Sequence, residues 1–135
     1  MTEENAHEEA EKYSKKITGE SDVAKVIETE DKMRKYFSKV KVLQKYWSDL
    51  CDVLALLKDR VSGKYTDTPW VTIAALAGAL LYVITPIDVI PDFILLLGFT
   101  DDAAVFAAAL KFAGKDIAKY HEWRNNAQKV IDVKN

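Results

Sequence analysis

The sequence predicts an all-α protein, a small helical bundle around a central apolar helical hairpin. Three observations support this fold class. Only five glycines and three prolines interrupt the 135 residues, and no apolar–polar alternation of period two lasts long enough for a sheet. Apolar residues recur at spacings of three and four over 33–61. The helices of the predicted hairpin, about 69–85 and 101–125, contain the uncharged runs 68–87 and 103–110 and flank a break rich in proline and aspartate. The length suits one domain.

The first 20 residues are polar and charged, with few large apolar side chains. We therefore expect residues 1–20 to form a weakly ordered segment, with a helix that ends near Gly19, and residues 21–135 to form a single all-α domain. Ser21 and Asp22 can cap the next helix, because a short polar side chain accepts from free backbone N–H groups.

Residues 33–61 predict one long helix that packs against other helices. Its apolar seam is Met33, Tyr36, Val40, Leu43, Trp47, Leu50, Leu54, Leu57 and Val61. Lysines and aspartates, which carry opposite charges, lie between the seam positions. This mixture of charges indicates a solvated face rather than a nucleic-acid surface. Gly63 is expected to end the helix.

Residues 68–87 contain no charged side chain. A helix of this length would extend about 30 Å, the thickness of a bilayer's hydrocarbon core. Asp67 or Thr68 is the expected N-cap, and Pro69 suits the first turn. Trp70 and Tyr82 would be interface anchors in a bilayer and core residues in a soluble bundle. Small residues around Gly78 permit close approach of another helix in either setting.

The break after this run contains Pro86, Asp88, Pro91, Asp92 and Gly98, and Asp101 and Asp102 follow it. Each proline disfavours helix at the residue before it, so Thr85 and Ile90 are expected to be extended or turn-like. Thr100 or Asp101 is then placed to cap the next helix.

Two interpretations account for the acids. Asp88, Asp92, Asp101 and Asp102 are candidate ligands for a hard divalent cation such as Mg²⁺ or Ca²⁺. They are alternatively caps that accept from backbone N–H groups freed around the prolines, each worth ~1 kcal/mol. Capping is favoured because it accounts for prolines and acids together. No pattern identifies a catalytic residue, and no cofactor is expected.

The residues quoted above resemble the signature of the YkvA-like family, domain of unknown function 1232. The resemblance covers about residues 65–112, and its signature positions are Asp67, Pro69, Trp70, Tyr82, Pro86, Asp88, Pro91, Asp92, Gly98, Asp101 and Asp102. No activity is established for the family. The resemblance implies a fold and a link to membranes, and it implies no reaction.

Three classes of function follow. The first is a non-enzymatic, membrane-associated helical protein at the cytoplasmic membrane face, with membrane lipid or a membrane protein as partner. The second is a soluble helical adaptor, and the third is a divalent-metal-binding protein or hydrolase that uses the four aspartates. A small-molecule substrate stays unknown.

The net charge of −2 and the pI near 5.7 argue against nucleic acid. One cysteine, and an N-terminus without a signal-peptide pattern, indicate a cytoplasmic protein that is not secreted.

Overall fold

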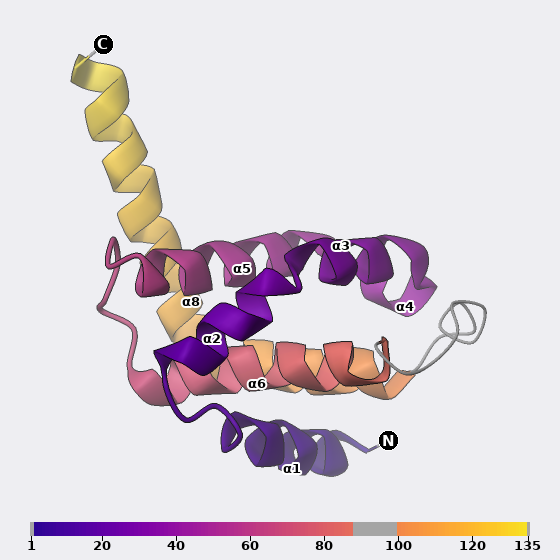
Figure 1. Ribbon diagram of the computed structural model, residues 1–135. Coiled ribbons are helices and arrows are strands. Elements are labelled where there is room, and N and C mark those ends of the chain that lie inside the picture. The colour runs from indigo at the N-terminus through magenta and orange to yellow at the C-terminus, as the bar shows by residue number, and fades with distance from the viewer. Residues whose placement is uncertain (1, 88–99, 135) are drawn as a thin grey trace.

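The computed structural model describes residues 2–87 and 100–134, and helices joined by short loops make up these ranges. Figure 1 shows these helices in chain order. They are α1 (Glu3–Ser14), α2 (Glu20–Glu28), α3 (Glu30–Lys39), α4 (Lys41–Gln44), α5 (Trp47–Val61), α6 (Trp70–Ile87) and α8 (Thr100–Lys134). No strand occurs in these two ranges, and the predicted all-α class is confirmed.

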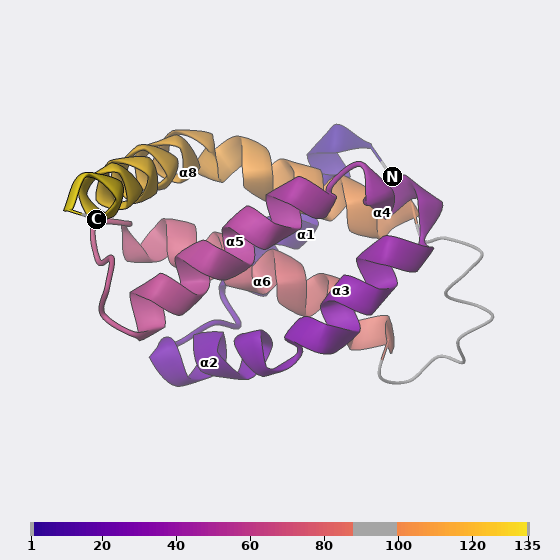
Figure 2. The same ribbon diagram turned by 90° about the horizontal axis from the view of Figure 1, so that it is seen from above.

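The centre of the fold is the antiparallel pair of α6 and the first half of α8 (Figure 1). This pair is the predicted apolar hairpin. α1 packs across one side of it, while α2, α3 and α5 cover the other side (Figures 1 and 2). The second half of α8 projects beyond the bundle. The hairpin is therefore enclosed by helices from the N-terminal part of the chain.

α6 is a core helix in this arrangement. Its large side chains Ile73, Leu76, Leu80 and Val83 are fully buried, and they pack in the same cluster as residues of α3, α5 and α8. Burial of this kind is the main favourable contribution to folding. Within residues 2–87 and 100–134, no helix combines the length and the hydropathy needed to cross a membrane.

α1 docks on α6 through an unusually close approach at Gly78. A Cβ atom placed on Gly78 would lie 2.6 Å from the backbone nitrogen of Ser14 and 2.7 Å from its Cα. Ala6 and Ala10 of α1 are also buried. The helix ends at Ser14, earlier than the expected Gly19. The division into a weakly ordered segment 1–20 and a domain 21–135 stays a prediction.

The prediction of one continuous helix over 33–61 is wrong, because the chain bends twice within it. Val40 adopts an extended conformation between α3 and α4, and α5 begins only at Trp47. The side-chain amide of Gln44 donates to the carbonyl of Ser38 at 2.9 Å and so satisfies a group that the bend leaves free. Most of the predicted seam is buried nevertheless, with Trp47 and Val61 as its exposed members.

The ends of α5 and α6 follow the expected signals in part. Gly63 has a φ of +81°, the left-handed conformation that terminates helices. Pro69 directly precedes α6, and its carbonyl accepts from the backbone N–H groups of Thr72 and Ile73. The buried hydroxyl of Thr68 makes no hydrogen bond with any described residue, so Thr68 is not the cap.

α6 continues through Thr85 to Ile87, which contradicts the extended conformation expected at Thr85. A residue before proline disfavours the helical conformation but can adopt it. Pro86 lacks a backbone N–H, and because it lies in the final turn of α6 only one helical hydrogen bond is lost. The Thr85 hydroxyl donates to the carbonyl of Leu81 at 2.6 Å. The corresponding expectation for Ile90 lies outside the described residues.

Candidate functional site

The described signature residues lie toward the two ends of the hairpin. Asp67, Pro69 and Trp70 stand at the start of α6, whereas Tyr82 and Pro86 belong to its second half. Asp101 and Asp102 lie in the first turn of α8. Asp88, Pro91, Asp92 and Gly98 lie outside the described residues. The structure therefore separates the signature into an α6 N-terminal group and a group near the α6–α8 connection.

Asp102 is the most buried acid among the described residues, with 2% of its surface exposed. Tyr36 of α3 donates its hydroxyl hydrogen to the Asp102 carboxylate, at 2.5 Å between the oxygens. Burial raises the pKa of Tyr36 far above its usual value, and Asp102 raises it further, so the phenol keeps its proton. Asp102 makes a further contact beyond this one. The signature acid thus joins α8 to α3 inside the core.

Tyr82 anchors α1 to the hairpin. Its ring meets the ring of Tyr13 edge to face, with 5.0 Å between the centroids. Such pairs add about 0.5–1.5 kcal/mol beyond the area they bury. Together with Gly78 one turn earlier, this signature residue holds the C-terminal half of α1.

Trp70 lies at the opposite end, beside Arg60 of α5. The guanidinium carbon of Arg60 lies 5.9 Å from the Trp70 ring centroid, and its Nη1 donates to the backbone carbonyl of Thr68 at 2.7 Å. Arg60 also pairs with Glu20 of α2 at 3.2 Å. Arg60 therefore fixes the loop that enters α6 and connects it to α2 and α5. A single arginine late in a helix gave no sequence signal for this role.

Comparison with known proteins identifies the same segment. Residues 72–108 match a protein family described as "Protein of unknown function (DUF1232)". We refer to residues 72–108 as the DUF1232 segment. The chain is also 41% identical over 69 residues to the "Uncharacterized membrane protein YkvA" of Bacillus subtilis (strain 168), which confirms the predicted resemblance. That alignment covers 51% of this chain and 65% of the relative, just under two thirds of the relative's length. No solved structure matches the chain significantly.

The DUF1232 segment coincides with the hairpin, since it runs from the first turn of α6 to the first third of α8. The described partners of its key side chains lie outside it. Tyr36 and Tyr13, which contact Asp102 and Tyr82, belong to α3 and α1. The DUF1232 segment alone thus supplies only one half of each contact.

Two further side-chain hydrogen bonds attach α8 to its neighbours. The Thr72 hydroxyl donates to Asp116 at 2.6 Å, and the Tyr120 hydroxyl donates to Asp59 at 2.6 Å. Tyr120 is fully buried, and this burial together with the hydrogen bond to Asp59 raises its pKa to about 12. Both pairs join residues more than 40 positions apart. The pairs are structural links between helices, which periodicity alone could not reveal.

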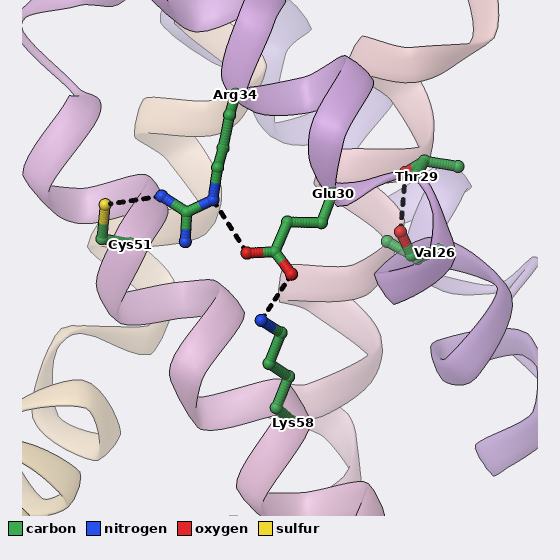
Figure 3. A network of polar contacts seen from close by, with 6 residues as sticks. All are labelled: Val26, Thr29, Glu30, Arg34, Cys51 and Lys58. Carbon is green, nitrogen blue, oxygen red and sulfur yellow. Dashed lines mark hydrogen bonds and ion pairs between the residues drawn. The ribbon is translucent and has the colours of Figure 1, made fainter.

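A separate polar network ties α3 to α5 (Figure 3). Glu30 pairs with Lys58 and accepts from Nε of Arg34 at 2.8 Å, while Nη1 of Arg34 donates to the Cys51 sulfur at 3.3 Å. The hydrogen bond from Lys58, and then Arg34, lower the pKa of the Glu30 carboxyl. Cys51, the chain's one cysteine, is a half-buried free thiol. The network stabilises a helix contact that sequence analysis did not anticipate.

The proposed metal site stays a prediction. Within residues 2–87 and 100–134, no three histidine, cysteine or acidic side chains gather as a metal site requires. Asp88 and Asp92 lie outside these ranges, and Asp102 already accepts from Tyr36. Titration with Mg²⁺, Ca²⁺ or Mn²⁺ while the amide shifts near the four aspartates are followed is the direct test. No perturbation at millimolar metal would exclude the site.

Proposed function

We propose that this chain is a non-enzymatic helical protein that associates with the cytoplasmic face of a membrane, in contact with membrane lipid or a membrane protein. The observation that carries the proposal is the 41% identity over 69 residues to a protein named as a membrane protein. The matched length of 69 residues exceeds the DUF1232 segment itself, which spans residues 72–108.

The burial of α6 favours a peripheral association. Its apolar face is already covered by α1, α5 and α8, so inserting it into lipid would require these contacts to open. Insertion of the whole hairpin would also carry the buried Asp102 of α8 toward lipid, where an ionised acid costs a few kcal/mol or more. Contact through the outer surface of the folded bundle avoids this cost.

Fractionation of the untagged, natively expressed protein tests the proposal. Membranes are washed with high salt, then with alkaline carbonate, and finally with detergent. A peripheral protein sediments with membranes and is released by salt or carbonate. Retention until detergent would indicate that the 68–87 run inserts, and absence from membranes at low salt would refute the proposal.

A soluble helical adaptor is the second candidate. The enclosure of the charge-free helix α6 by its neighbours favours it, because a helix that is apolar on all sides is satisfied inside a bundle. In that case the protein stays in the supernatant at every salt concentration and co-purifies with a soluble partner. The same fractionation therefore separates the two candidates.

A further inference from the structure

Two exposed apolar side chains stand out on the surface. Among the described large hydrophobic residues, Val71 is 60% exposed and Phe112 is 56% exposed, whereas the other exposed members of this class lie between 36% and 39%. Both side chains line one pocket of about 280 Å³. Val71 belongs to the first turn of α6 and Phe112 to the middle of α8, so the hairpin brings them together.

The surface around them is mostly apolar where α6 and α8 form it. Ala75, Ala108 and Ala109 line the same pocket from these two helices. The side from α1 is more polar, with His7, Ala10, Glu11 and Ser14. The pocket is smaller than those that usually enclose a drug-sized ligand. A pocket of this size can accept only a small apolar group. The exposed side chains of Val71 and Phe112 can in turn enter an apolar environment outside the protein.

The charges beside this surface suit anionic headgroups. Lys115 and Lys119 lie three and seven positions after Phe112, so they continue the Phe112 side of α8, and both are exposed. Three acids beside this surface have partners. Glu11, which lines the pocket, lies 3.8 Å from Lys15, and Glu3 lies 2.9 Å from Lys111. Asp116 accepts from the Thr72 hydroxyl at 2.6 Å. An apolar surface bordered by lysines is typical of proteins that lie on the boundary between headgroups and acyl chains.

We propose that Val71 and Phe112 form the lipid-contacting surface of the protein, with Lys115 and Lys119 facing anionic headgroups. This inference rests on the proposed membrane association and specifies its partner as the bilayer itself. Trp70, which is adjacent to Val71 and partly exposed, would then lie at the level of the headgroups.

The test measures partition of the full chain onto vesicles of phosphatidylcholine with and without phosphatidylglycerol. The double variant Val71→Gln/Phe112→Ser removes the apolar surface, and we expect its partition coefficient to fall about tenfold or more. Lys115→Gln/Lys119→Gln should lose about fivefold per lysine on anionic vesicles and little on neutral ones. Val61→Gln is the matched control, since Val61 is an exposed valine at the end of α5 that does not line this pocket.

A second readout confirms that the variants report on contact rather than on folding. Far-UV circular dichroism and urea unfolding should match the wild type for all three. In a Trp47→Phe/Trp123→Phe background, Trp70 fluorescence should shift to shorter wavelength and be quenched by brominated lipid.

The outcomes separate this inference from the proposed function. Equal vesicle binding by the wild type and Val71→Gln/Phe112→Ser overturns the inference and leaves membrane association intact. Binding to native membranes but not to protein-free vesicles overturns it in favour of a membrane protein as partner. Binding to neither contradicts both proposals.

Discussion

The contact between Gly78 and the end of α1 makes a quantitative prediction. A methyl group on Gly78 would approach three backbone atoms of Tyr13 and Ser14 at 2.6–2.7 Å, well inside ordinary contact distance. Backbone atoms cannot rotate away as a flexible side chain can, so α1 has to shift or detach. Overpacking of this kind costs about 1–3 kcal/mol.

The substitution Gly78→Ala also carries a gain, because alanine is about 1 kcal/mol more favourable than glycine within a helix. Gly114 isolates this gain, since it lies within α8 and a Cβ there meets nothing within 4 Å. We expect Gly114→Ala to raise the free energy of unfolding by about 1 kcal/mol. The difference between the two variants should then equal the steric cost, about 1–3 kcal/mol.

Urea unfolding followed by far-UV circular dichroism measures both variants, and limited proteolysis shows where the loss occurs. Trypsin should cleave after Lys15 and Lys16 faster in Gly78→Ala than in the wild type, because α1 leaves its site more often. Equal stability changes in Gly78→Ala and Gly114→Ala, with unchanged cleavage, would refute the close docking of α1 on α6.

Three other perturbations test the polar contacts. Tyr36→Phe removes a donor to the buried Asp102 carboxylate and should lower the free energy of unfolding by about 1.5–3 kcal/mol in urea titrations; a loss below about 0.5 kcal/mol contradicts this role. The pKa of Tyr120 is raised from its usual 10 to about 12. Its contribution to the free energy of unfolding should therefore be present below pH 10 and lost as the pH rises toward 12. Tyr120→Phe should remove this dependence of stability on pH. Glu30→Gln should cost about 1 kcal/mol or less at low salt, and the difference from wild type should shrink in high NaCl, which a contribution from packing would not do. Because basic partners lower the pKa of Glu30, its contribution should disappear as the pH falls through that lowered value.

The hairpin could be predicted because its signals are local. The charge-free run 68–87 and the apolar segment after the break each exceed the length of a strand, and both became helices. The small residues around Gly78 indicated close helix approach, which α1 then makes. The bend at Val40 could not be predicted, because neither glycine nor proline marks it. Its conformation depends on tertiary contacts that override local propensity.

The residues of the candidate site could be predicted from the sequence, but the residues that they contact could not. Asp102 was identified as a signature acid, yet its described hydrogen-bond donor lies 66 residues away in the sequence. The described ring contact of Tyr82 is with Tyr13 of α1, a segment whose polar composition suggested weak order. Pairings across such separations follow from packing geometry, which periodicity does not encode.

These contacts show how the DUF1232 segment packs against the rest of the protein. Gly78, Tyr82 and Asp102 each contact a residue of α1 or α3 that lies outside the segment, so helices from the N-terminal part of the chain complete the packing of the hairpin. The helices that cover it also determine which apolar groups stay outside. Val71 and Phe112 stay exposed because α1 passes beside them, lining the same pocket without covering either side chain. An apolar surface that persists while the rest of the hairpin is buried has a cost in water, and contact with a membrane would offset that cost.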